Sequence, residues 1–159
     1  MSLALVKDTG PKVDVPGTAQ FSTFFVAGRL YGIDVRQVQE VVKPLPMTQI
    51  PLAQPYIRGL INLRGQVATA IGLHQLFGLT QSTSRELMNV ICRCDGNLVS
   101  LLADDIGDVM ELSASQYEPV PATIDPMIRR FMSGVYKVSG PLVSIIDSDK
   151  VARFLSTQN

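Results

Sequence analysis

Four acidic residues in the second half of the chain are the first candidates for chemistry. Asp104, Asp105, Asp108 and Glu111 lie within eight residues of one another. Paired carboxylates can act as general acid and general base, or can hold a cation. The same pattern also fits a solvated loop after a strand, which is the more common arrangement. A small hydrolase using Asp104 and Asp105 therefore stays a hypothesis, to be dismissed if Asp104→Asn with Asp105→Asn keeps full function.

The histidine and the two cysteines lack the neighbouring residues that a catalytic or metal-binding site needs. His74 is the only histidine, and residues 73–77 (LHQLF) contain no acid or cysteine. Cys92 and Cys94 are two apart in a segment typical of a strand, so their side chains share a face. A zinc site needs about four ligands. We predict a surface histidine, two ordinary packed thiols, and neither a metal nor a cofactor.

No nucleophile motif or phosphate loop is present. The chain has no G-x-S-x-G sequence around a serine. The spacing of Gly59 and Gly65 resembles a phosphate loop, but no Gly-Lys-Ser/Thr follows. Gly134 and Gly140 repeat the same spacing, which indicates turn geometry. We therefore predict that the chain has no catalytic residues.

The composition of the chain limits the kinds of molecule that it is expected to bind. Fourteen Lys and Arg residues balance 14 Asp and Glu residues, and 46% of the chain is hydrophobic. A neutral chain lacks the positive field that attracts nucleic acid, so a small β-barrel that binds oligonucleotides is only an alternative, one that would show steeply salt-dependent binding. The apolar runs are far shorter than the roughly 20 residues of a membrane helix. We expect a cytoplasmic protein without membrane insertion.

Short apolar segments broken by Gly, Pro, Asn and Asp predict a mainly β chain. The pattern at 36–43 fits a helical turn and a strand equally well, and prolines mark an extended connection at 44–56. The expected elements are a flexible tail at 1–20, a hairpin of 21–26 with 30–35, a hairpin of 57–63 with 66–71, a helical turn at 73–77, a terminal helix at 147–155 and a C-terminal tail at 156–159.

The second half of the sequence repeats the first. The residues around the first hairpin recur with an offset of 68, so that Gly28 corresponds to Gly96, and those of the second hairpin recur with an offset of 75. We predict a single domain, 21–155, of two similar barrel-like halves at roughly 21–82 and 83–155. Each half alone is marginal in size, so the two should pack tightly as one cooperative body.

Two charged residues are embedded in strongly apolar strand sequence. Arg64 precedes the glycine of a hairpin tip, and its repeat equivalent is Ser139, so the hairpin itself does not require an arginine. Glu40 stands among valines. In one interpretation, Arg64 is simply an exposed turn residue and Glu40 a solvated carboxylate on a strand. They also fit selective charges at the rim of an apolar interface, where arginine is enriched.

Three segments resemble the CheW family of bacterial chemotaxis coupling proteins. Residues 25–41 (FVAGRLYGIDVRQVQEV) resemble the family's opening hairpin and its V-Q-E segment. Residues 57–65 (IRGLINLRG) resemble its most specific signature, a G-x-x-N-L-R-G hairpin, and 102–109 (LADDIGDV) resemble the V-D-x-V-x-D-V run. The order and spacing hold over about 130 residues from Phe21 onward.

The resemblance implies a fold of two five-stranded SH3-like β-barrels around a common core, and a non-catalytic adaptor. Such proteins bind the CheW-like regulatory domain of the histidine kinase CheA and the cytoplasmic hairpin tip of methyl-accepting chemoreceptors, in arrays at the membrane. The resemblance does not indicate which residues of this chain would contact the kinase. The positions that match places implicated in receptor coupling are Val38, Glu40 and Arg64, with Gly59 and Gly65 more suited to shaping the hairpin.

The chain departs from the family pattern after the second hairpin. Gly72 and Leu73 stand where an Asp-Leu pair is usual, and Ala68 and Thr69 replace a more apolar pair. These changes affect a barrel edge and the surface beside it. A CheW-like scaffold or decoy of a non-flagellar chemosensory pathway is therefore an alternative to a true coupling protein.

Overall fold

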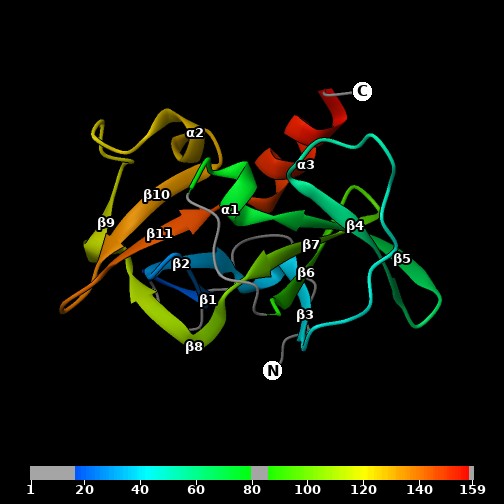
Figure 1. The fold of residues 1–159 in the computed structure, drawn as a ribbon. Helices are drawn as coiled ribbons and strands as arrows, with labels where there is room; N and C mark the ends of the chain where they lie inside the picture. Colours follow the sequence, from blue (N-terminus) through cyan, green and yellow to red (C-terminus); the bar gives the residue numbers. More distant parts are fainter. Residues whose placement is uncertain (1–16, 80–85, 158–159) are drawn as a thin grey trace.

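The computed structural model describes residues 17–79 and 86–157, and within these ranges the chain forms two β-sheets with short helices (Figure 1). The strands are β1 (Thr18–Val26), β2 (Arg29–Asp34), β3 (Val38–Val42), β4 (Ile57–Leu63), β5 (Gln66–Gly72), β6 (Met88–Cys94), β7 (Asn97–Ala103), β8 (Asp105–Ser113), β9 (Tyr117–Glu118), β10 (Met132–Lys137) and β11 (Leu142–Ile146). Sheet A has the order β8-β1-β2-β11-β10-β9, and sheet B has the order β3-β6-β7-β5-β4.

The predicted hairpins are present. β1 pairs antiparallel with β2 and β4 with β5, and the repeat supplies the matching pairs β6 with β7 and β10 with β11. The ambiguous segment at 36–43 begins as a 3-10 helix, Val35–Gln37, and continues as β3. β3 is extended because it pairs with β6, a strand about 50 residues later, and no local pattern could reveal this pairing.

The two sheets do not follow the predicted division of the chain at residue 82. Sheet A combines β1 and β2 with strands of the second half, and sheet B combines β6 and β7 with strands of the first half. The hairpins are joined by parallel pairs, β2 with β11 and β5 with β7. The structure thus repeats the same hairpins in both halves of the chain, but each sheet combines hairpins from the two halves, an arrangement that we call exchanged hairpins. Neither sheet closes into a barrel through the strand pairs found in the described residues, which corrects the closed form that was expected.

The main core lies between the sheets and contains side chains from both halves. A row of aromatic rings runs through it: Phe24 to Tyr31 at 6.0 Å, Tyr31 to Phe77 at 5.4 Å and Phe77 to Phe131 at 6.3 Å between ring centroids. Smaller cores lie on the opposite face of each sheet, since Ala70 and Ile145 belong to them while the next residues, Ile71 and Ile146, belong to the main core. That the two halves unfold as one cooperative body stays a prediction.

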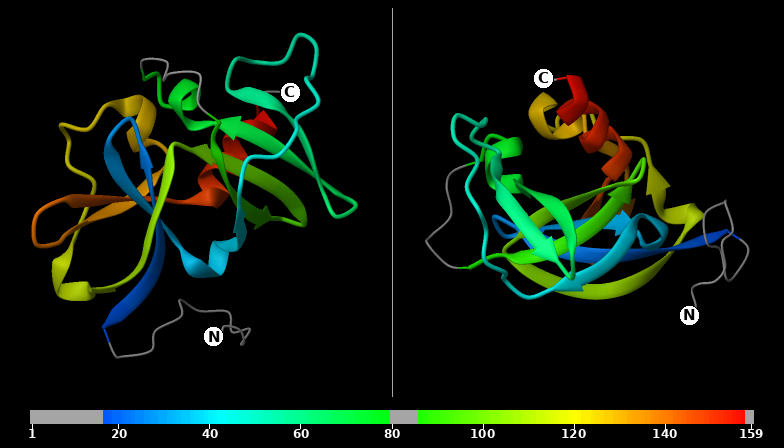
Figure 2. Two further views of the ribbon diagram at one scale, coloured as in Figure 1. Left: turned by 60° about the horizontal axis from the view of Figure 1, so that its bottom comes forward. Right: turned by 90° about the vertical axis from the view of Figure 1, so that its right-hand side faces the viewer.

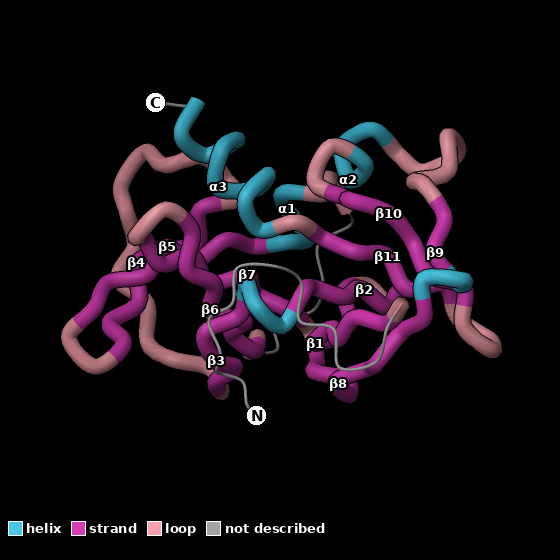
Figure 3. The backbone as a smooth tube through the Cα atoms, turned by 180° about the vertical axis from the view of Figure 1, so that it is seen from behind, coloured by secondary structure: helices cyan, strands magenta, loops and turns pink. Residues whose placement is uncertain are grey.

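The three α-helices of the described residues lie on one side of the molecule (Figures 1 and 3). They are α1 (Leu73–Leu76), α2 (Pro126–Arg129) and α3 (Ser148–Thr157). α1 and α3 follow β5 and β11 at equivalent places in the repeat, as predicted for 73–77 and 147–155. α3 continues two residues into the expected tail at 156–159, and β1 begins at Thr18, inside the expected tail at 1–20. Residues 1–16 of that tail lie outside the described residues.

Candidate interaction site

Glu40 and Arg64 form an ion pair on the surface of sheet B. Glu40 lies on the edge strand β3, and Arg64 lies in the turn after the opposite edge strand, β4. Nη2 of Arg64 donates to Oε2 of Glu40. The Arg64 side chain is 68% exposed and that of Glu40 27%. An exposed pair stabilises a fold by at most about 1 kcal/mol, so its donors and acceptors can serve a partner.

The turn that carries Arg64 has a fixed backbone. Arg64 has φ of 51° and Gly65 has φ of 90°, and the Gly65 amide donates to Oδ1 of Asn62 at 2.9 Å. Positive φ suits glycine because it has no Cβ. A Cβ on Gly65 would have no atom within 4 Å. Gly65 thus shapes the turn without filling a packed space.

Gly59 has a different role, because another segment lies directly on it. A Cβ at this position would lie 2.8 Å from the carbonyl oxygen of Thr48. Thr48 and Leu60 exchange two backbone hydrogen bonds of 2.9 and 2.8 Å there. Gly59 therefore allows the long connection between β3 and β4 to lie against β4, along the outside of sheet B (Figure 2).

Val38 lies two residues before Glu40 on β3, but it belongs to a different environment. Its side chain packs against the main core between the sheets. The pairing of β3 with β6 shifts register between Val38 and Glu40. Such a bulge changes the direction of the side chains beyond it. The structure thus brings Glu40 and Arg64 together and leaves Val38 as a partly buried support of the same strand.

Arg93 is a residue of this surface that sequence reasoning missed. It projects from β6, and its guanidinium donates to Oε1 of Gln39 at 2.8 and 3.1 Å and to Oε1 of Gln66 at 3.2 Å. Arg93 is a charge within the apolar strand β6. The criterion that singled out Glu40 and Arg64 would have found it too.

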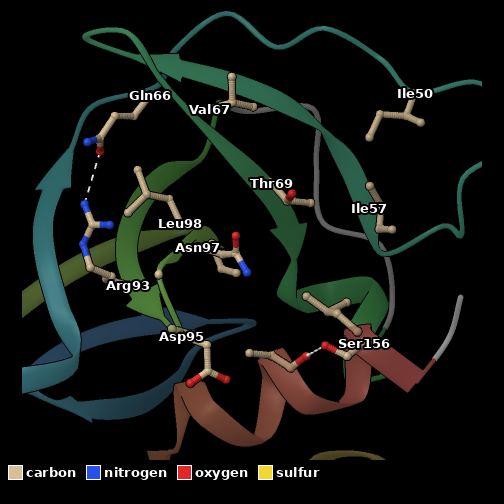
Figure 4. Close-up of a pocket in the computed structure, with 15 residues that line it drawn as sticks. Ile50, Ile57, Gln66, Val67, Thr69, Arg93, Asp95, Asn97, Leu98 and Ser156 are labelled. Carbon is tan, nitrogen blue, oxygen red and sulfur yellow. Dashed lines mark hydrogen bonds between the residues drawn. The ribbon is translucent and has the colours of Figure 1, made fainter.

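A hollow of about 650 Å³ on the described surface begins at Arg93. Figure 4 shows it between β5, which carries Val67 and Thr69, and α3, which carries Ser156. Ile57 borders its far end. Its walls are formed by sheet B, by the β6–β7 turn and by α3, and they combine apolar side chains such as Val67 and Leu98 with polar ones such as Asp95.

The prediction that His74 lies on the surface is wrong. Its side chain is only 3% exposed, and its Nε2 lies 2.9 and 3.0 Å from the two carboxylate oxygens of Asp104. Asp104 also accepts a hydrogen bond from the Ala27 amide at 2.8 Å. The partner lies 30 residues away in the sequence, so the residues around His74 did not reveal it. The pair joins α1 to the β7–β8 junction and to the β1–β2 turn.

The remaining candidates for chemistry do not converge. Asp105 accepts from the neighbouring Ile106 amide at 2.9 Å, and Glu111 from the hydroxyl of Thr18 at 3.2 Å. No group of three or more His, Cys, Asp or Glu side chains that could hold a metal exists among residues 17–79 and 86–157. Cys92 and Cys94 are buried, as predicted, and burial raises the pKa of both thiols.

The helices of the described chain are too short or too polar to cross a lipid bilayer.

Comparison with known proteins gives one consistent result. Residues 20–155 match the family description "CheW-like domain". The chain is 28% identical over 137 residues to the chemotaxis protein CheW of Treponema pallidum, covering 83% of this chain and 81% of that protein. It is 29% identical over 137 residues to the chemotaxis protein CheW of Bacillus subtilis, covering 86% and 88%.

A solved structure gives the same answer for the fold. The crystal structure of the scaffolding protein TtCheW from Thermoanaerobacter tengcongensis superimposes with a TM-score of 0.72 at 32% identity, covering 80% of this chain and 87% of that one. The family match at residues 20–155 spans strands of both sheets and includes Glu40 and Arg64. This chain belongs to the CheW-like domain family.

Proposed function

We propose that this protein is a non-catalytic adaptor that couples chemoreceptors to a CheA-type histidine kinase in a chemosensory array. The observation that carries the proposal is the CheW-like match across residues 20–155, which spans both sheets. The arrangement of the charged and reactive groups supports it. The acids are dispersed and the thiols are buried, whereas Glu40 and Arg64 are exposed at the rim of a sheet.

We assign receptor coupling to the surface formed by Glu40 and Arg64, with Val38 supporting the strand beneath. Gly59 and Gly65 hold the connection and the turn that frame this surface. The kinase regulatory domain is the second partner, bound elsewhere on the molecule. We place the protein in the cytoplasm, recruited to receptor arrays.

An adaptor transmits a signal only through differences in binding. Its contacts with receptor or kinase must differ in free energy between the active and inactive states. Single contacts can be near micromolar, about −8 kcal/mol, because an array presents many copies and multiplies weak contacts. An exposed ion pair suits this task, since it can exchange partners at low cost.

Reconstitution tests the proposal. The purified chain is titrated with the kinase regulatory domain, with a chemoreceptor cytoplasmic hairpin fragment, and with both together, and kinase autophosphorylation is measured with and without the chain. We expect binding to each partner and receptor control of the kinase only when the chain is present. Binding to the kinase without the receptor would indicate a decoy. Binding to neither partner would refute the proposal.

A further inference from the structure

Sheet A curls on itself, so that one of its faces encloses a second apolar core. Its two edge strands, β8 and β9, follow one another along the chain and are separated only by a 3-10 helix, Ala114–Gln116 (Figure 1). An extended residue spans at most about 3.6 Å, so the facing ends of the two edges lie close together. The core that the curled sheet encloses consists of Phe21, Leu112, Val143 and Ile145, with Tyr136 packed against it.

A cavity of about 280 Å³ lies at one end of this curled sheet. The volume is just below the roughly 300–1,000 Å³ of most small-molecule sites, which often lie at the mouths of β-barrels. Phe21, Ile145 and Tyr136 line the cavity from the enclosed core. We call it the mouth of sheet A. The residues that line it nearer the strand ends are Tyr117, Asp34, Arg36, Gln37, Ser133 and Asp147.

Three aromatic rings line the mouth and contact one another. The ring centroid of Tyr136 lies 5.2 Å from that of Phe21 and 5.5 Å from that of Tyr117. Tyr117 is 44% exposed, yet two contacts fix its position. Its hydroxyl donates to the Ser133 carbonyl at 3.0 Å, and its ring occupies the space that a Cβ on Gly134 would fill. The mouth therefore presents a preformed aromatic surface.

The charged side chains that line the mouth are two carboxylates and one guanidinium. Nε and Nη2 of Arg36 donate to the two carboxylate oxygens of Asp34 at 3.1 and 2.9 Å. The salt bridges of the described residues do not include Asp147. Its Oδ1 accepts from the Gln37 side chain at 3.0 Å and from the Asp149 amide at 2.9 Å, which are neutral donors. The mouth thus has a net negative charge, carried by Asp147.

The fold does not require these residues, because the repeat supplies a matching end of sheet B without them. With the offsets of 68 and 75, the equivalents of Phe21, Tyr136 and Asp147 are Asn89, Ile61 and Gly72. Sheet B has the same hairpins with no ring and no carboxylate at these three positions. The rings and the acid are therefore particular to the mouth of sheet A.

Aromatic rings and a carboxylate together favour an organic cation. A cation over the face of a ring is attracted to it, and quaternary ammonium groups are recognised in this way. Free acceptors at the mouth are few: in the described part of the chain, Oδ2 of Asp147 and the hydroxyls of Tyr136 and Ser133 have no hydrogen-bond partner. A guanidinium has five N–H donors to satisfy, whereas a quaternary ammonium group has none.

The hydroxyl of Tyr136 stays neutral beside such a ligand. Burial, followed by Tyr117 and the carboxylate of Asp34, raises the pKa of Tyr136. The ring therefore keeps its proton, and the charge that attracts a cation comes from Asp147.

We propose that the mouth of sheet A binds a small quaternary ammonium compound. Its positive head lies against the rings of Tyr117 and Tyr136, and Asp147 balances its charge. The mouth lies at the strand ends of sheet A, whereas Glu40 and Arg64 pair on sheet B. The inference therefore does not rest on the proposed function, and it adds a small-molecule site to a chain proposed to bind proteins.

Titration of the full chain with choline tests the proposal. The chain has four tyrosines and no tryptophan, and Tyr117 and Tyr136 line the mouth, so tyrosine absorbance and fluorescence report on the site. The control ligand is neohexyl alcohol, in which carbon replaces the charged nitrogen of choline. We expect saturable binding of choline and at least about tenfold weaker binding of neohexyl alcohol, because the rings and the carboxylate attract only the charged compound.

Two pairs of variants locate the binding. Asp147→Asn removes the charge at the mouth and keeps a side chain that can cap α3, and it should weaken choline binding at least about tenfold. Asp105→Asn removes an equal charge from the exposed start of β8 and should change the affinity by less than about twofold. Tyr117→Leu should weaken binding about threefold or more, whereas Tyr117→Phe keeps the ring and should not. Melting temperatures within a few degrees of wild type confirm that the variants are folded.

Four results would overturn the proposal: no saturable binding of choline, equal affinity for choline and neohexyl alcohol, equal losses in Asp147→Asn and Asp105→Asn, or tighter binding of guanidinium than of choline. The same headgroup can come from a protein, so a peptide that contains trimethyl-lysine is titrated alongside. Tighter binding of the peptide than of choline would assign the ligand to a protein side chain, and weaker binding to a free compound.

The outcome is separate from that of the proposed function. If choline binds while the kinase regulatory domain and the receptor fragment do not, this site stands and the adaptor function is refuted. If both proteins bind and choline does not, the adaptor function stands and the site is refuted.

Discussion

At Glu40 and Arg64, a contribution to the stability of the fold can be distinguished by substitution from a contribution to partner binding. Both side chains reach solvent, so their mutual attraction is screened and contributes at most about 1 kcal/mol to stability. At the centre of an interface the loss of an arginine costs about 2 kcal/mol or more. A single substitution therefore affects the two properties to different extents.

We predict that Arg64→Ala lowers the affinity for the receptor fragment at least about tenfold and leaves the melting temperature nearly unchanged. Titration and thermal unfolding of the same sample measure both effects. The exchanged pair Glu40→Arg with Arg64→Glu is the control, since it restores the ion pair with its ends reversed. If the exchanged pair binds the receptor as wild type does, the ion pair acts only by holding the surface in shape. A large drop in melting temperature with unchanged binding would make Arg64 a structural residue.

The sequence identified these two residues but not their contact. A charge within an apolar strand is visible in any single segment, and both Glu40 and Arg64 satisfy that criterion. Their contact joins residues 24 apart on opposite edges of a sheet, and only the curvature of the sheet brings them together. His74 is a second residue whose contact could not be predicted from the sequence around it. Its burial depends on Asp104, and nothing in the residues around His74 indicates that partner.

At the scale of elements, the hairpin of β4 and β5 requires glycine at two positions, and the physical reason differs between them. Both have a positive φ, 90° at Gly65 and 153° at Gly59, but Gly65 lies in an open turn, whereas at Gly59 a Cβ would also contact the Thr48 carbonyl. The sequence predicted both as shapers of the hairpin. It could not distinguish them, because the connection that lies on Gly59 belongs to the irregular segment between β3 and β4.

We predict that Gly59→Ala destabilises the protein more than Gly65→Ala does. The left-handed backbone at Gly65 costs a residue with a Cβ about 1–2 kcal/mol. At Gly59 the close contact with the Thr48 carbonyl adds about 1–3 kcal/mol of overpacking. Chemical denaturation of the two variants measures the free energies of unfolding. Equal losses, or a larger loss for Gly65→Ala, would show that the connection moves away from β4 without cost.

At the scale of the whole molecule, the exchange of hairpins makes each half depend on the other. Sheet A joins β2 of the first half to β11 of the second, and sheet B joins β5 to β7. The sequence predicted the repeat and the hairpins because glycine turns and alternating side chains are local. It did not predict which hairpins lie side by side, since parallel pairing between distant strands leaves no mark on either strand alone.

We predict that the fragments 1–82 and 83–159 are unfolded when separate and assemble when mixed. Each fragment holds only part of both sheets, and the main core needs side chains from both. Circular dichroism during heating should show a cooperative transition for the mixture and none for either fragment. A cooperative transition in one fragment alone would mean that its strands can form a complete sheet without the exchange.

The parallel pairing of β2 with β11 also has a consequence for biosynthesis. Sheet B has all its strands once residue 103 has emerged from the ribosome, and β1 has its second neighbour, β8, once residue 113 has emerged, whereas β2 must wait for β11 at 142–146. Contacts between residues so far apart slow folding, because a long loop must close before they form. A nascent chain thus leaves the β2 edge of its first hairpin, which carries the buried ring of Tyr31, without its second neighbour until translation is almost complete. We expect such a chain to bind a chaperone at the tunnel exit, and we expect the surface of Glu40 and Arg64 on sheet B to form before sheet A is complete.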